Sequence, residues 1–239
     1  MSRLSTSQDL LQSPLPSVGL AKPDLPEWVM TLPGVRRVVQ KIGVSEFRRR
    51  LFHMSPALIP VGLPFLPHED VWSTPLLALI VIISVVVLVM AVAVAPLVTR
   101  NRNDNWMFAV VGYMLPVVAP LLLFPGRAEL GLMTLQILAL GDGSATLGGL
   151  TLGGRRLPWN RKKTFTGLLC FTLVGSLAAT YSFWGECRPG IHVGTAFVVC
   201  GTAALCAAIV ESLPIRTNDN LRVGTTALIA GIVMSALML

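Results

Sequence analysis

The sequence predicts an all-α, polytopic integral membrane protein with about seven transmembrane helices. Three observations lead to this prediction: the composition, a series of long apolar runs, and the one-sided placement of basic residues. Of the 239 residues, 53% are hydrophobic and only 13% are charged, whereas soluble proteins usually carry about 25% charged residues. A chain made mostly of spans of about 20 residues and short loops has room for about seven such spans.

The N-terminal part of the chain lacks an apolar run. Residues 1–34 are predicted to be a flexible lead-in, because their first part is polar and rich in proline. Residues 35–53 follow as a basic amphipathic stretch, which suits an interfacial helix on an anionic membrane surface. A solvated basic helix with no role in a site is the alternative. Residues 35–239 form the expected membrane-embedded domain.

Seven apolar segments are the predicted spans. The first, residues 54–67, is the weakest, because it holds four prolines and is short unless its helix begins before His53. The second, residues 75–98, is rich in leucine, valine and isoleucine. The other five are residues 106–124, 128–150, 164–184, 191–213 and 223–239, with a polar loop at 151–163.

The basic residues indicate the orientation of these spans. With the N-terminus inside and alternating spans, 17 of the 19 lysines and arginines fall inside, and only Arg127 and Arg188 fall outside. Cytoplasmic loops carry such an excess of positive charge. The net charge of +7 is therefore interpreted as orientation bias and not as nucleic-acid binding. The compact chain, in which no transit peptide is visible, leads us to expect a bacterial inner membrane.

Asp142 is the main candidate for a functional side chain within the membrane. It lies toward the inner end of the fourth span, in the glycine-rich segment LALGDGSATLGG. An ionisable residue at membrane depth costs about 2.5–3.5 kcal/mol on insertion scales and is a functional hypothesis by default. Glycine permits unwound backbone and close approach to a ligand. A carboxylate paired with a basic residue for structure alone is the alternative.

A second group of polar residues precedes the first span. Glu46, Arg49, Arg50 and His53 follow one another at intervals of three, one and three residues, which places them along one side of a helix. Surface ion pairs at the membrane interface are the alternative. The predicted topology places this group on the same inner face as Asp142.

Two further polar groups fall on the inner face: a basic run before the fifth span, and a group of acidic and amide residues near the end of the chain. Cations at the start of the fifth span oppose the helix dipole, and an anion bound there would relieve the conflict. The run consists of Asn160, Arg161, Lys162, Lys163 and Thr164. Glu211 lies at the inner end of the sixth span, and Asp219 and Asn220 follow in the next loop. Positive-inside anchoring for the run, and a turn or helix cap for Asp219 and Asn220, are the alternatives.

Together these groups suit a nucleotide–metal site at the cytoplasmic membrane face. Carboxylates with an asparagine suit a hard cation such as Mg²⁺, and lysine and arginine suit phosphates. Phosphoryl transfer needs positioned cations, a metal bridge and an oriented nucleophile. The sequence contains no Walker A motif, kinase HRD motif, GxSxG elbow or HExxH zinc motif. The second reactant could enter from the bilayer.

At these residues the sequence resembles the dolichol kinase/phytol kinase family, which includes polyprenol kinases and CTP-dependent diacylglycerol kinases. The resemblance covers about residues 46–239. Four motifs carry it, namely Glu46, Arg49, Arg50 and His53; Gly141, Asp142, Ala145 and Gly149; Lys163, Thr164 and Gly167; and Glu211, Asp219 and Asn220. Three positions depart from the family pattern: Leu150, Leu168 and Gly224 stand where a basic residue, a hydroxyl residue and proline are usual.

The resemblance implies transfer of a phosphoryl group, typically from CTP, to the hydroxyl of a membrane lipid alcohol. Polyprenols such as dolichol, phytol, farnesol and diacylglycerol are the alcohols of this family. The implied catalytic residues are Asp142, Lys163 and His53. The implied nucleotide-binding residues are Asn160, Lys162, Lys163, Thr164, Gly167, Asn220, Arg49 and Arg50. The implied ligands of Mg²⁺ are Asp142, Asp219 and Glu211.

Three other functions remain open. A membrane cytidylyltransferase would also join CTP to a lipid, but it would release pyrophosphate. A transporter for an anionic lipid would need charges near the bilayer midplane, whereas the charges here gather toward one face. A membrane scaffold without activity is the third. The expected partners are a lipid alcohol, a nucleoside triphosphate and membrane lipids, with a homo-oligomer as a further option.

Overall fold

The computed structural model describes residues 25–32, 34–65, 73–98, 106–187, 190–215 and 217–239. Within these ranges every named element is helical, and the only β-type pairing is an isolated antiparallel bridge between Arg156 and Thr164. The predicted all-α class is therefore confirmed. Most of the expected lead-in, residues 1–24 and 33, lies outside the described residues, and its final part contains the short helix α1 (Glu27–Thr31).

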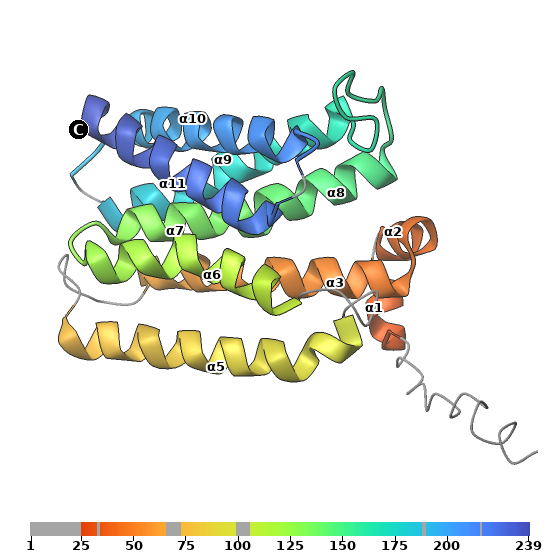
Figure 1. Ribbon diagram of the computed structural model, residues 1–239, viewed down its shortest axis with the longest axis horizontal. Helices are drawn as coiled ribbons and strands as arrows, with labels where there is room; N and C mark the ends of the chain where they lie inside the picture. The colour runs from red at the N-terminus through yellow and green to blue at the C-terminus, as the bar shows by residue number, and fades with distance from the viewer. Residues whose placement is uncertain (1–24, 33, 66–72, 99–105, 188–189, 216) are drawn as a thin grey trace, which may run out of the picture.

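Long apolar helices lie alongside one another and form the body of the molecule (Figure 1). They are α5 (Thr74–Val98), α6 (Trp106–Leu123), the composite helix α7–η3–α8 (Ala128–Thr151), α9 (Phe165–Cys187), α10 (Val193–Ser212) and α11 (Asp219–Met238). Each overlaps one predicted span. The largest difference in a boundary is at α11, which begins four residues before the predicted position, because Asn218 caps it through a bond from the Leu221 N–H.

Four of these helices are long and apolar enough to cross a membrane: Ala128–Thr151, Phe165–Cys187, Val193–Ser212 and Asp219–Met238. Two further apolar stretches, Thr74–Met90 and Met107–Leu123, are shorter. The chain thus has the helices of a polytopic membrane protein. The count of seven spans and their orientation stay predictions.

The predicted basic helix over residues 35–53 is wrong in one respect, because it is divided into α2 (Val35–Ile42) and α3 (Val44–Met54). Gly43 separates them at φ +83°, a left-handed conformation that glycine adopts without strain. In α2, Val39 is buried while its polar neighbours are exposed, as expected of an amphipathic helix.

The weakest predicted span does not begin at residue 54. Helical backbone continues without a break from α3 through η1 (Ser55–Ala57), α4 (Leu58–Gly62) and η2 (Leu63–Phe65). Pro56 is tolerated because it stands in the first turn of a short 3₁₀ segment. Side chains of neighbouring helices bond to carbonyls of this segment: Gln136 Nε2 donates to Ala57 (3.3 Å) and the Tyr181 hydroxyl donates to Val61 (3.2 Å).

The core is formed chiefly by the C-terminal half. Helix α9 packs against α7, α8 and α10, and α11 packs against α10 and α6. Small residues allow this close packing, since α10 buries Ala203, Ala204, Ala207 and Ala208 completely. Helix α5 contacts α6 and α3 at the edge of the bundle (Figure 1).

One end of the bundle collects the basic segments. Helix α2, the start of α3, the end of α8 and the loop between α8 and α9 all lie at this end, which is on the right in Figure 1. The loop between α6 and α7, with Arg127, lies at the opposite end. We call these the basic end and the far end. The candidate site is built from helices that converge toward the basic end.

Candidate functional site

Asp142 occupies a special position in its helix. A π-helical turn, η3 (Ile137–Gly141), directly precedes α8 (Asp142–Thr151), so Asp142 is the first residue after the change in helical winding. Such π turns occur frequently at functional sites. The glycine-rich segment, which could have allowed unwound backbone, stays helical. Its glycines serve helix packing instead: a Cβ on Gly141 would lie 2.9 Å from the Phe171 ring of α9.

The Asp142 carboxylate is held by two basic side chains of α3. Arg50 Nη1 donates to Asp142 Oδ2 over 3.0 Å, and His53 Nε2 lies 3.2 Å from the same oxygen. The side chains of Asp142, Arg50 and His53 are 17%, 14% and 16% exposed, respectively. A largely buried charge is stable only when it is paired in this way. The structure therefore brings the first two motifs together, although they are far apart in the sequence.

Glu46 organises the arginines of α3. Its carboxylate accepts two bonds from Arg49, at 2.7 and 3.0 Å, and one from Arg50 Nε at 3.1 Å. Burial alone would raise the pKa of Glu46, but the hydrogen bonds and charges of Arg49 and Arg50 outweigh it and lower the pKa to about 2. Arg50 thus bridges two carboxylates, Glu46 and Asp142, with different nitrogens.

His53 is oriented by its surroundings. Its Nε2 lies 3.0 Å from the Leu138 carbonyl as well as near Asp142. The Tyr113 ring of α6 meets the His53 ring edge to face, with centroids 5.0 Å apart, and the Tyr113 hydroxyl donates to the His53 carbonyl over 3.2 Å. These contacts hold the imidazole against η3 and α8.

Lys163 and Glu211 form a second ion pair beside Asp142. The Lys163 ammonium bonds to Glu211 Oε1, and the Glu211 side chain is only 5% exposed. The charges of Lys163 and Glu211 both interact with that of Asp142. Three helices and one loop therefore bring Arg50, His53, Asp142, Lys163 and Glu211 into one charged cluster, which we call the inner cluster.

The loop before α9 is a tight turn that positions Lys163. The Leu157 N–H donates to the Lys163 carbonyl and the Lys163 N–H donates to the Asn160 carbonyl, both over 3.0 Å. Asn160 fastens the loop to the end of α10, since its Nδ2 donates to the Ser212 carbonyl over 3.0 Å. The exposed Lys162 donates its backbone N–H to Asn160 Oδ1 over 3.1 Å. Asn160 thus has a structural role in this loop.

Thr164 and Gly167 form the start of α9. The buried Thr164 hydroxyl accepts a bond from the Gly167 N–H over 3.0 Å, which is an N-cap interaction. A Cβ on Gly167 would lie 2.8 Å from the Ala145 carbonyl, so only glycine lets α9 approach α8 this closely. The Thr164 O–H can still donate, because the cap uses its oxygen as acceptor.

Asp219 and Asn220 each have a partner outside the inner cluster. Asp219 begins α11, is 64% exposed, and accepts a bond from Arg222 Nη2 over 2.9 Å. Asn220 donates to the Ala109 carbonyl of α6 over 3.0 Å. The structure does not bring either side chain into direct contact with Asp142. Asp219 is nevertheless near enough to Glu211 for the two charges to interact.

The predicted Mg²⁺ ligands are only partly assembled. Among the residues that the structure describes, no three histidine, cysteine, aspartate or glutamate side chains are grouped so that they could hold a metal ion. Asp142 and Glu211 offer two carboxylates, and the charge of Lys163 interacts with both of them. Mg²⁺ in nucleotide sites commonly takes one or two carboxylates and completes its shell with phosphate and water. This pair fits such a role.

Two residues of this region were not predicted from the sequence. Tyr113 orients His53 but lies in an apolar helix, where its only signal is that the chain has just two tyrosines. Arg222 stands in the first turn of α11, and its Nε and Nη1 are buried without a hydrogen-bond partner. In the sequence, Arg222 stands directly before the predicted last span, where it was counted only among the loop charges. Such unsatisfied donors make Arg222 a further cation that could bind an anion.

Comparisons with known proteins point to one group of enzymes. The chain is 36% identical over 98 residues to "Probable phytol kinase 3, chloroplastic" of Glycine max, a match that covers 39% of this chain and 31% of that protein. It is 28% identical over 129 residues to "Farnesol kinase, chloroplastic" of Arabidopsis thaliana, covering 51% and 41%. "Phytol kinase 1, chloroplastic" of Arabidopsis thaliana is 25% identical over 123 residues, covering 49% and 40%.

These matches are partial. They span 31–44% of the length of the curated relatives, and up to about half of this chain. No protein-family profile matches the chain, and no solved structure matches it. The resemblance predicted from the four motifs is confirmed, because the curated relatives are named as phytol and farnesol kinases. The relatives are plant proteins named as chloroplastic, so the expected bacterial inner membrane receives no support.

Proposed function

From the relationship of this chain to the phytol and farnesol kinases, we propose that it is a lipid-alcohol kinase. It transfers the terminal phosphoryl group of a nucleoside triphosphate to the hydroxyl of a membrane-borne alcohol. CTP is the donor that the resemblance implies, and an isoprenoid alcohol of the phytol or farnesol type is the favoured acceptor. The observation that carries the proposal is Asp142, which is held by Arg50 and His53 and lies beside Lys163.

In the proposed reaction, the alcohol oxygen forms a bond to the γ-phosphorus while the bond from that phosphorus to the β–γ bridging oxygen breaks. The products are the lipid phosphate and a nucleoside diphosphate. The hydroxyl proton passes to the Asp142 carboxylate. His53 and Arg50 orient this carboxylate before the reaction.

The cations of the inner cluster stabilise the charge on the phosphates. Phosphoryl transfer depends mainly on positioning and on electrostatic stabilisation of the equatorial oxygens. Lys163 pairs with Glu211 in the free protein, and it can exchange this partner for a phosphate oxygen. Arg49 presents a side chain that is 40% exposed, and the exposed Lys162 lies next to Lys163. Both can contact a nucleotide that enters from the basic end.

Asp142 and Glu211 are the residues that would hold Mg²⁺ together with the nucleotide. The ion, when bound, would neutralise charge on the β- and γ-phosphates. Asp219 stands farther out, paired with Arg222. We assign it to the outer boundary of the nucleotide site. Thr164 donates its free O–H to a phosphate while it continues to cap α9.

We also propose that all seven predicted spans cross the membrane and that the basic end faces the cytoplasm. The concentration of lysine and arginine at that end supports this orientation. Two exposed positions test it: Lys162→Cys in the loop before α9 and Gly126→Cys in the loop before α7. In a variant without the four native cysteines, in sealed vesicles of known orientation, an impermeant thiol reagent should label Lys162→Cys only from the cytoplasmic side and Gly126→Cys only from the other side. Labelling of Lys162→Cys from the non-cytoplasmic side would contradict the orientation.

The activity itself is tested with purified protein and a nucleotide labelled at the γ-phosphate. CTP and ATP are each supplied with phytol, farnesol, dolichol and diacylglycerol. The proposal predicts transfer of label to an isoprenoid alcohol without release of pyrophosphate. Release of pyrophosphate would identify a cytidylyltransferase instead. A folded protein that transfers no label to any of these alcohols would contradict the kinase proposal.

A further inference from the structure

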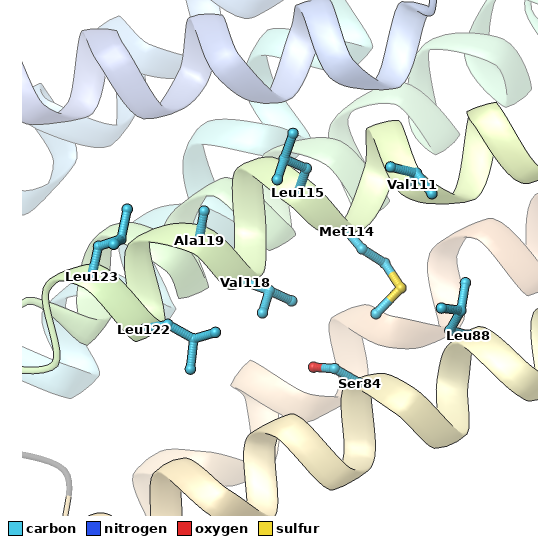
Figure 2. A pocket seen from close by; sticks show the side chains of 9 residues that line it. All are labelled: Ser84, Leu88, Val111, Met114, Leu115, Val118, Ala119, Leu122 and Leu123. Atoms are coloured by element: carbon cyan, nitrogen blue, oxygen red, sulfur yellow. The ribbon is translucent and has the colours of Figure 1, made fainter.

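Helices α5 and α6 enclose a groove of about 450 Å³ on the flank of the bundle. Figure 2 shows the side chains that line it, which come from the middle of α5 and from most of α6. The lining is aliphatic or methionine apart from Ser84. The volume lies within the range of small-molecule sites, which are mostly apolar with few polar groups.

We propose that this groove binds the hydrocarbon chain of the alcohol substrate. The inference rests on the proposed kinase activity and adds the location of the acceptor's chain. An apolar groove on the flank of the bundle suits a lipid chain, because its aliphatic side chains can pack against the chain and Ser84 is the only polar residue of the lining. The lining offers no charged side chain to a nucleotide.

Helix α6 links the groove to the inner cluster. Met114 lines the groove, and the adjacent Tyr113 contacts His53 through its ring and its hydroxyl. His53 in turn lies 3.2 Å from Asp142. Helix α3, which carries His53, also contacts α5. Helix α3 therefore contacts both of the helices that line the groove.

The direction of the groove suits an acceptor that lies along the membrane normal. Its lining on α6 runs from Val111, near the basic end, to Leu123 at the far end of the helix. Twelve residues separate these positions, which corresponds to about 18 Å of helix at 1.5 Å per residue. A chain in this groove would extend away from the basic end, and its hydroxyl would lie at the level of Tyr113 and His53.

The test fills the groove without touching the inner cluster. Ser84→Phe and Ala119→Phe place a ring in the groove. Val85→Phe is the matched control, because Val85 is 53% exposed on the same helix but does not line the groove. We expect the two groove variants to raise KM for farnesol roughly tenfold. The KM for the nucleotide, and transfer to a short water-soluble isoprenoid alcohol, should stay unchanged. Equal KM values for farnesol in Ser84→Phe and Val85→Phe would overturn the inference.

A binding measurement separates this inference from the kinase proposal. A farnesol analogue with a photoreactive diazirine at the tail is cross-linked to the purified protein, and the labelled peptides are mapped. The inference predicts labelling of α5 and α6 that excess farnesol competes away and that Ser84→Phe abolishes, whether or not phosphate is transferred. Labelling of α5 and α6 that excess farnesol does not compete away, or that Ser84→Phe leaves unchanged, would show a general lipid-facing surface and would overturn it. Competed groove labelling in a protein without transferase activity would contradict only the kinase proposal.

Discussion

Arg50 Nη1 and Asp142 Oδ2 are 3.0 Å apart although 92 residues separate them in the chain. The same guanidinium bonds through Nε to Glu46. Arg50 therefore joins the interfacial helix α3 to the glycine-rich helix α8. This relationship gives the first two sequence motifs a common place, and it makes Arg50 the most informative position for a conservative substitution.

Arg50→Lys should fold but lose most of its activity. Lysine keeps the charge, but its single ammonium cannot reproduce a planar fork that binds two carboxylates through separate nitrogens. We expect kcat to fall by roughly 10- to 100-fold with only a small change in Tm. The measurement is steady-state transfer with farnesol beside thermal unfolding in detergent. Wild-type kcat in Arg50→Lys would show that charge alone is required there.

Glu46 should make stability depend on acid pH. Its pKa is lowered to about 2 in the folded protein. A carboxyl with a lowered folded pKa stabilises the fold above its unfolded pKa, and this contribution is lost as pH falls from about 4.5 toward about 2. The difference in Tm between wild type and Glu46→Gln should therefore be largest at neutral pH and shrink on acidification. A difference that stays constant over this range would exclude Glu46 as the titrating group.

Lys163 and Lys162 should differ sharply in importance. Lys163 contacts Glu211 and influences Asp142, whereas the side chain of Lys162 is exposed. Lys163→Met should lower kcat/KM for the nucleotide by about 100-fold or more, because a cation is lost from the transferring phosphate. Lys162→Met, the matched control, should lower it less than about fivefold, as expected of an exposed charge. Equal losses would indicate that the whole basic run attracts nucleotide without a specific contact.

Thr164 should have a double role that serine can fill. Thr164→Ala removes the cap of α9 and should lower the free energy of unfolding by about 1 kcal/mol. It also removes the O–H proposed to bind phosphate, so KM for the nucleotide should rise severalfold, and Thr164→Ser should restore both values. Gly167→Ala is the comparison, since its Cβ meets the Ala145 carbonyl and should reduce stability while leaving the hydroxyl in place. A nucleotide KM that is unchanged in Thr164→Ala would leave this residue with the cap alone.

The helices were predictable because apolar length is a strong signal in a membrane protein. The start of α3 at Val44 was not predicted, because residues 35–53 were expected to form one helix, whereas Gly43 divides them. The four prolines in residues 54–67 predicted only a weak first span. The structure accommodates Pro56 at the start of a 3₁₀ turn, and Gln136 bonds to a nearby carbonyl from another helix. Such tertiary contacts cannot be read from a local pattern.

The candidate site was likewise predictable only in part. Charged residues in an apolar chain are easily found, and five of the predicted residues meet in the inner cluster. The π turn before Asp142 is not visible in the local sequence pattern, and the packing of Tyr113 on His53 depends on how α6 meets α3. Asn220 was predicted as a ligand because asparagine binds metals and nucleotides, but it bonds to the Ala109 carbonyl. Its partner depends on the approach of α11 to α6.

The central claim is that Asp142 activates the lipid hydroxyl, and Asp142→Asn tests it most directly. Glu129→Gln is the matched control, because Glu129 is a buried carboxylate paired with Arg127 at the far end. Transfer of γ-labelled phosphate to farnesol is measured for both purified variants, with thermal unfolding as the check on folding. The account predicts that Asp142→Asn lowers kcat by about 100-fold or more, while Glu129→Gln keeps near wild-type kcat. Full kinase activity in a folded Asp142→Asn protein would contradict the account.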